Sequence, residues 1–170
     1  MIRANKRWWI VCIFSLIPTS ASWGLPEDSE QEIYIESDNA SLDKLQGQLV
    51  YNGNVKMTQG SLNIEADHIT ITRSENGLKE VIAKGSPAKY EQVISANEGK
   101  TIAYGQTIIY NTQEDELTLL KEAGLEKQGN RFVGEKIVYL IKEQRVKADS
   151  PEPQERIKMV IQPKQDKENK

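Results

Sequence analysis

Apolar residues occupy every second position through most of this chain, and they almost nowhere follow the 3.6-residue period of a helix. In the clearest stretch, Leu62, Ile64 and Ala66 alternate with polar residues, and Ile69 and Ile71 alternate with threonines. Similar stretches contain Ile33 and Ile35, Leu49 and Tyr51, Val55 and Met57, Leu117 and Leu119, Ile137 and Tyr139, and Ile157, Met159 and Ile161. Each is expected to be a strand with one apolar and one solvated face.

Clusters of turn-forming residues separate these stretches. They are Asn52-Gly53-Asn54, Gln59-Gly60-Ser61, Glu75-Asn76-Gly77 and Gln128-Gly129-Asn130. Short strands joined by such turns, each with one apolar face, are typical of antiparallel sheets that pack face to face or roll on themselves. The sequence therefore predicts an all-β protein.

An internal repeat supports this prediction. The first copy contains Gly53-x-Val55 and Gln59-Gly60, and the second, about seventy residues later, contains Gly124-Leu125 and Gln128-Gly129. In both copies a strand, a glycine turn and a second strand follow one another. Such a repeat indicates a stack of β-hairpins that grows along one axis, each unit burying its apolar face on its neighbours.

The N-terminus has the layout of a secretory signal peptide. Three basic residues fall within the first seven positions, residues 8–17 are all apolar apart from one serine, and mostly small residues follow as far as Gly24. The apolar run is shorter than the roughly 20 residues that cross a bilayer, although an uncleaved short anchoring helix is the alternative. We expect cleavage after Ala21, Ser22 or Gly24. The expected organisation is a cleaved signal over residues 1–24, a single β domain over 25–163 and a disordered tail over 164–170.

Cleavage would change the composition of the chain. It removes Cys12, so the exported protein has no cysteine and forms no disulfide. It also removes three of the 22 basic residues and none of the 25 acidic ones, which leaves 19 against 25 and a net charge of −6. A negative net charge argues against nucleic acid as the partner.

The inventory of reactive side chains predicts no catalytic site, metal site or cofactor. His68 is the one histidine, and it lies on the polar face of its predicted strand, where a solvent-facing role is expected. Glu65 and Asp67 share the polar face of the same strand and are the candidate pair if the protein is instead a secreted β-solenoid enzyme acting on polysaccharide. A solvated strand face explains them more simply.

The first and last predicted strands lack the residues that normally protect a sheet edge. Residues 33–36 contain neither lysine nor proline, and Lys158 is the one charge among residues 157–162. A bare strand edge recruits another chain, unless loops or tails cover it. From the residues alone both readings stay open. The apolar faces are equally compatible with a dry core and with a groove that admits acyl chains.

Several stretches, in their order and spacing, resemble the LptA family of lipopolysaccharide-transport proteins. They are Ile33–Asp38 with Ser41-Leu42-Asp43, Gly53-Asn54-Val55 with Gln59-Gly60, Ala66–Arg73, Lys79–Ile82, Gly85–Tyr90 and Tyr139–Gln144. The similarity extends from about Ile33 to Ala148.

The resemblance implies a twisted antiparallel β-jellyroll, open at both ends, with an apolar interior groove. It implies that the acyl chains of lipid A, the lipid part of lipopolysaccharide, lie in this groove, and that protomers join head to tail in the periplasm. It also implies an inner-membrane-anchored transport subunit at the N-terminal edge and the periplasmic domain of the outer-membrane translocon at the C-terminal edge. A membrane-anchored paralogue of the same fold is the nearest alternative.

The resemblance and the alternation together give two sets of site residues. Those expected to bind lipopolysaccharide are Ile33, Ile35, Val55, Met57, Ile64, Arg73, Lys79, Ile82, Tyr90, Ile108, Tyr110, Leu117, Leu119, Phe132 and Tyr139. Those expected to contact partners at the edges are Ile33, Tyr34, Ile35, Glu36, Ile157, Met159 and Ile161. Tyr90 stands where the family more usually has phenylalanine, so its hydroxyl needs a polar partner or water.

Overall fold

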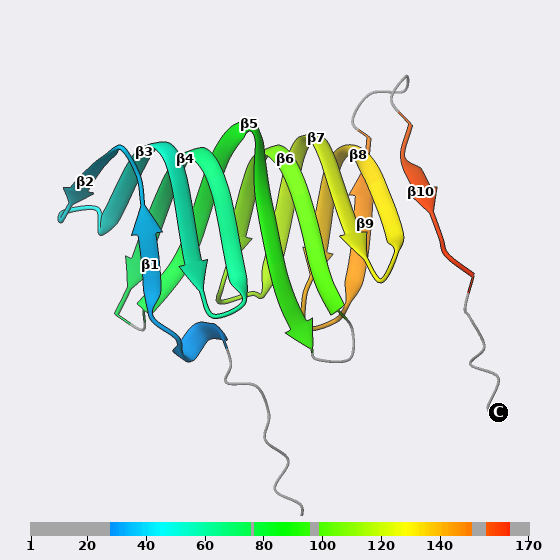
Figure 1. The fold of residues 1–170 in the computed structure, drawn as a ribbon, viewed down its shortest axis with the longest axis horizontal. Coiled ribbons are helices and arrows are strands. Elements are labelled where there is room, and N and C mark those ends of the chain that lie inside the picture. The colour runs from blue at the N-terminus through cyan, green and yellow to red at the C-terminus, as the bar shows by residue number, and fades with distance from the viewer. Residues whose placement is uncertain (1–27, 76, 96–98, 151–155, 164–170) are drawn as a thin grey trace, which may run out of the picture.

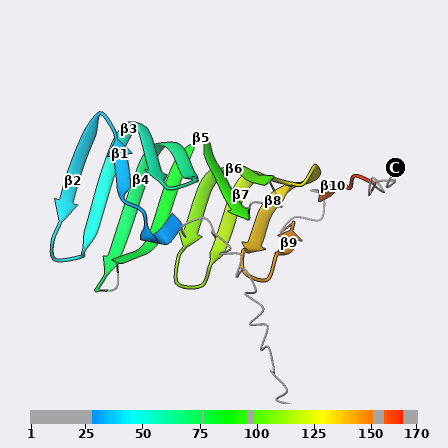
Figure 2. The ribbon, with the colours of Figure 1, turned by 60° about the horizontal axis from the view of Figure 1, so that its bottom comes forward.

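In the computed structural model, which describes residues 28–75, 77–95, 99–150 and 156–163, every strand belongs to one antiparallel sheet. A 3-10 turn, η1 (Asp28–Glu30), precedes the strands. They are β1 (Ile33–Glu36), β2 (Asn39–Asp43), β3 (Gln48–Gln59), β4 (Leu62–Ser74), β5 (Gly77–Ser95), β6 (Gly99–Asn111), β7 (Glu116–Lys127), β8 (Asn130–Leu140), β9 (Arg145–Asp149) and β10 (Lys158–Val160). Figure 2 shows them following one another along one axis, from β2 at one end to β10 at the other. The predicted all-β fold is confirmed, and none of the described helices is long and apolar enough to cross a membrane.

The sheet is bent into two layers along a continuous line of pairing irregularities. The register shifts at Asn52/Val55 in β3, Glu65/His68 in β4, Lys84/Ala88 in β5, Tyr104/Thr107 in β6 and Leu120/Ala123 in β7. Extra residues at such shifts kink a strand and increase its twist. Because the shifts lie next to one another on paired strands, each long strand passes from one layer to the other there, as Figure 1 shows.

The bend corrects one sequence prediction. Asn52-Gly53-Asn54 is not a turn between two strands but a bulge inside β3. Gly53 and Asn54 have φ values of 81° and 46°, in the left-handed region that glycine and asparagine tolerate best. The chain therefore kinks without reversing, and β3 pairs with β4 on both sides of the kink.

The predicted glycine turns at Gly60 and Gly129 are confirmed. Gly60 joins β3 to β4 and Gly129 joins β7 to β8, both with positive φ. The two copies of the sequence repeat are therefore two hairpins of the same sheet. The first strand has the predicted bounds, whereas the last, expected over residues 157–162, is the shorter β10.

The core fills the space between the layers. The alternation places one face of every long strand inward, where apolar side chains from both layers interdigitate. An aromatic pair and a hydrogen bond are among the contacts that join the layers. The ring of Tyr90 meets that of Tyr110 edge-on at 5.9 Å between centroids, and Lys127 Nζ donates a hydrogen bond to the Tyr139 hydroxyl at 2.9 Å.

Candidate functional site

A groove of about 1450 Å³ runs between the layers along the side opposite the bend. It lies between two rows of strand ends: residues 59–62 and 92–94 belong to one layer, and residues 71–74, 77–78, 110–115 and 141–144 to the other. Its apolar lining consists of Ile33, Ile35, Leu49, Tyr51, Leu62, Ile71, Leu78, Val93, Ile94, Tyr110 and Ile141. The interior thus has two regions, a packed core near the bend and a groove near the open side.

The structure brings four of the predicted lipid-binding residues to the groove. Ile33 and Ile35 line it from β1, Arg73 from the end of β4 and Tyr110 from the end of β6. Arg73 is exposed and supplies a cation at the edge of an apolar surface.

A second group of predicted residues lies in the packed core that adjoins the groove. Those that are at most 1% exposed are Val55, Met57, Ile64, Tyr90, Ile108, Leu117, Leu119 and Tyr139. Phe132 is partly buried against the same core. In this structure these side chains pack against one another.

Lys79 and Ile82 are not brought to the groove. Lys79 is the extra residue at the register shift between Thr72 and Arg73, and its side chain is exposed. Ile82 lies between the two inward residues Val81 and Ala83, so it points to the outer face of β5. In a run of three apolar residues, alternation alone does not show which parity is buried.

The sequence reasoning missed part of the lining. Leu49, Leu62 and Ile71 lie on the apolar faces that alternation predicts for their strands. Alternation does not give their distance from the bend, which decides whether they reach the groove. Val93 and Ile94 are adjacent in sequence and both line the groove, which strict alternation does not anticipate.

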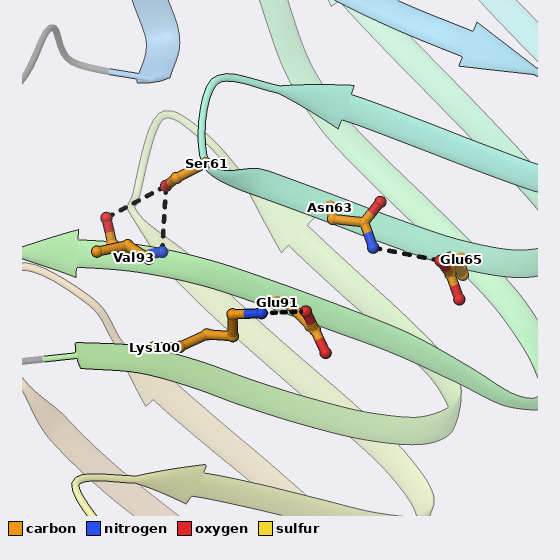
Figure 3. Close-up of polar contacts among 6 residues, drawn as sticks. All are labelled: Ser61, Asn63, Glu65, Glu91, Val93 and Lys100. Atoms are coloured by element: carbon orange, nitrogen blue, oxygen red, sulfur yellow. Dashed lines mark hydrogen bonds and ion pairs between the residues drawn. The ribbon is translucent and has the colours of Figure 1, made fainter.

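Residues 28–31, which we call the clasp, lie at one point of the groove opening. The Asp28 carboxylate accepts hydrogen bonds from the Ser61 amide at 2.7 Å, the Ser61 hydroxyl at 2.6 Å and Gln92 Nε2 at 2.7 Å. Gln59 Nε2 donates to the carbonyls of Ser29 and Gln31 at 3.3 and 3.0 Å. Figure 3 shows that the Ser61 hydroxyl also lies against both backbone groups of Val93.

A hydrogen-bonded chain connects the clasp to the core. The Tyr90 hydroxyl donates to Gln92 Oε1, and Gln92 Nε2 in turn donates to Asp28. This is the polar partner that the sequence required for Tyr90. Burial raises the pKa of the Tyr90 hydroxyl well above its usual value, so the group remains a neutral donor.

The candidate catalytic groups contact polar neighbours on the outer strand faces. Glu65 accepts a hydrogen bond from Asn63 Nδ2 at 3.4 Å (Figure 3), and Asp67 is exposed at the bend. His68 Nδ1 lies 2.5 Å from Asn52 Oδ1, and its Nε2 lies 3.1 Å from Thr70 Oγ1. Among the described residues no three His, Cys, Asp or Glu side chains are grouped as metal ligands would be.

An open two-layer jellyroll with an apolar lateral groove defines the structural class, and comparison with known proteins defines the family. The profile described as "LptA/(LptD N-terminal domain) LPS transport protein" matches residues 34–145. The chain is 41% identical to the lipopolysaccharide export system protein LptH of Pseudomonas aeruginosa, over 86% of this chain and 87% of the relative. It is 35% identical to the export protein LptA of Escherichia coli K12, over 95% of this chain and 89% of the relative.

A solved structure agrees in fold. The crystal structure of LptH, described as the LptA-homologous periplasmic component of the lipopolysaccharide transport device of P. aeruginosa, superposes with a TM-score of 0.74 at 40% identity. The match covers 81% of this chain and all of that one. The chain belongs to the LptA/LptD N-terminal domain family of lipopolysaccharide-transport proteins. These relatives are named as transport proteins, and the expectation that the protein is not an enzyme is confirmed.

Proposed function

We propose that this protein is a periplasmic carrier that holds the acyl chains of lipid A in its groove and leaves the sugars in solvent. The observation that carries the proposal is the apolar groove that stays open along one side of the molecule. An open side suits a ligand of which one part is apolar and the other is too large and polar to enter.

The energetics favour such a path over a free lipid in water. Covering acyl chains gains about 25 cal/mol for each Å² of apolar surface removed from water. The aliphatic lining supplies this energy without strong directional contacts, so a lipid can move along the groove. Arg73 at the rim provides a charge for the anionic head group.

We also propose that copies join head to tail, so that their grooves form one bridge between the two membranes. Among the described strands, β1 and β2 pair on one side only, as do β9 and β10, which leaves both ends of the sheet unpaired. Exposed apolar side chains accompany these edges, including Tyr34 and Leu42 at one end and Met159 and Ile161 at the other. Such edges accept further strands.

The same edges would connect the bridge to its neighbours. In this proposal the N-terminal edge receives the inner-membrane-anchored subunit, and the C-terminal edge receives the periplasmic domain of the outer-membrane translocon. Residues 1–24, which lie outside the described residues, act as a cleaved signal. The N-terminal residue of the protein purified from periplasm tests this point. A start at residues 22–25 supports export with cleavage, whereas an intact Met1 indicates the anchored paralogue.

Binding of purified lipopolysaccharide to charge-insertion variants tests the groove. Ile35 lines it, and its neighbour Tyr34 points outward and is 64% exposed. A carboxylate among acyl chains is left without a partner, which costs several kcal/mol. We expect Ile35→Asp to weaken binding at least tenfold and Tyr34→Asp to leave it within about twofold, both measured in dilute solution. Equal effects of the two variants would contradict the proposed groove.

A separate variant tests the alternative function, an enzyme that acts on polysaccharide. Glu65→Gln combined with Asp67→Asn removes both candidate carboxylates, neither of which lines the groove. We expect lipopolysaccharide binding and export to remain unchanged. A polysaccharide-cleaving activity that disappears in this variant would support the enzyme instead.

A further inference from the structure

The groove is open in one half of the molecule and closed in the other. In the layer that contains Leu62 and Gln92, its lining ends at β5, and none of the described residues of β6, β7 or β8 in that layer lines it. In the opposite layer the lining continues beside β7 and β8, at Asp115 and Ile141. Beyond β5 the groove therefore has one lip instead of two, and we call this part the closed half.

The missing lip is a row of inward residues that continues from the groove into the closed half. Gln92 pairs with Thr101, and Thr101 pairs with Lys127. Gln92 lines the groove, whereas Thr101 is 1% exposed and Lys127 is partly buried. Directly opposite residues of antiparallel strands carry their side chains on the same face, with Cβ atoms about 4.5–5.5 Å apart. Thr101 and Lys127 therefore take, in the closed half, the place that Gln92 takes in the groove.

The opposite layer has a matching row. Tyr110 lines the groove and pairs with Leu117, and Leu117 pairs with Tyr139. Both Leu117 and Tyr139 are 0% exposed. Lys127 Nζ donates a hydrogen bond to the Tyr139 hydroxyl at 2.9 Å and lies 5.4 Å from the centroid of its ring. This contact, which we call the latch, joins the two rows where the groove stops, so a lipid that moves farther along the interior must separate it.

A buried hydroxyl lies beside the latch without a partner. Among the described residues, Thr101 Oγ1 is buried and forms no hydrogen bond. A buried polar group without a partner costs free energy, which a ligand that accepts its hydrogen would recover. The ammonium of Lys127 and the hydroxyl of Thr101 thus lie on adjacent strands and on the same inward face. Together they are donors of the kind that bind a phosphate.

We propose that Lys127 and Thr101 form a phosphate subsite, and that a phosphate-bearing lipid head group opens the latch by drawing the Lys127 ammonium away from Tyr139. The inference rests on the proposed carrier function and adds how the head group is recognised. A phosphate is a stronger acceptor for an ammonium than a neutral hydroxyl is. Lys127 is the last residue of β7, on the open side, so its ligand can keep its sugars in solvent.

Four variants separate the parts of the subsite. Lys127→Met keeps the apolar stem and removes the charge, and Lys127→Arg keeps the charge. Thr101→Val removes only the unpartnered hydroxyl, so it is expected to fold like the wild type. The control is Lys100→Met, which removes the same charge one position from Thr101. Lys100 lies on the outer face, where it is 52% exposed and forms an ion pair with Glu91 at 2.8 Å (Figure 3).

Equilibrium binding of lipopolysaccharide with and without its lipid A phosphates gives the outcome. We expect the wild type, Lys127→Arg and Lys100→Met to prefer the phosphorylated lipid by about tenfold. The preference should disappear in Lys127→Met and fall by about threefold in Thr101→Val. An undiminished preference in Lys127→Met would overturn the subsite. Inorganic phosphate alone should not bind measurably, and binding as tight as that of the lipid would overturn the assignment to a head group.

Tyr139→Phe tests the latch, because it removes the acceptor and keeps the ring. Stopped-flow measurements should show lipopolysaccharide associating about threefold faster or more, since less holds the layers together. The preference for the phosphorylated lipid should persist, because Lys127 is still present. An unchanged association rate would overturn the latch. A wild type that binds neither form of the lipid would instead overturn the proposed carrier function.

Discussion

Removal of the Asp28 carboxylate should release the clasp from the groove opening. In Asp28→Ala, three of the five hydrogen bonds that hold residues 28–31 to the hairpin ends are lost. Each contributes about 1 kcal/mol net, whereas ordering these four residues costs about 1–2 kcal/mol each. The bonds total about 5 kcal/mol against an ordering cost of about 4–8 kcal/mol, so the clasp is at best marginally held. A loss of about 3 kcal/mol should leave it mostly undocked.

Amide hydrogen exchange at Ser61 measures this release directly, because its N–H donates to Asp28. We expect exchange to accelerate by tenfold to a hundredfold at Ser61, while the amides of β7 are unchanged. Association with lipopolysaccharide should become faster, since more of the groove is uncovered. Unchanged protection of Ser61 would refute the reasoning.

Gly60→Ala should have the same effect without removing a charge. A Cβ at this position would lie 2.3 Å from Asp28 Oδ1, too close for the clasp to stay in place. Gly129→Ala is the matched control. It occupies the equivalent turn of the second hairpin, also with positive φ, but its Cβ would meet only the flexible side chain of Gln162 at 3.0 Å.

Two further predictions concern stability. Burial raises the pKa of Tyr90 above its unfolded value near 10, so its contribution to stability is complete below pH 10 and is lost as the pH rises further. Tyr90→Phe should lower the unfolding free energy by about 1 kcal/mol at neutral pH and flatten this alkaline loss of stability, both measured by denaturant titration. An unchanged alkaline loss would exclude Tyr90 as its source. Gly124 lies beneath the ring of Tyr104, whose atoms would be 2.1–2.4 Å from an added Cβ. Gly124→Ala should therefore lower the unfolding free energy by about 1–3 kcal/mol, whereas Gly134→Ala, with its nearest contact at 3.7 Å, should change it by less than about 1 kcal/mol.

The strands and their inward faces could be predicted from the sequence because alternation is a local signal. Ile33, Ile35, Met57 and Ile64 face inward as their parity required. The bend could not be predicted in the same way. Asn52-Gly53-Asn54 has the composition of a hairpin turn, and only its pairing with β4 on both sides shows it to be a bulge.

The groove and the clasp depended on features that lie far apart in the sequence. Whether a buried inward residue also reaches the groove depends on its distance from the bend: Ile64 and Ile71 of one strand are both buried in the core, but only Ile71 also lines the groove. The partners of Asp28 are 33 and 64 residues away, and nothing near Asp28 in the sequence indicates them. Residues 1–27 and 164–170, where the signal and tail were predicted, lie outside the described residues.

Photo-crosslinking in cells tests the central claim most directly. Ile71 and Thr70 are adjacent in β4, but Ile71 lines the groove and Thr70 points to the outer face. With a photoreactive residue at each position in turn, we predict that lipopolysaccharide is captured at position 71 and not at position 70. Capture at position 70 alone, or at neither position while the protein still supports export, would contradict a lipid path through the groove.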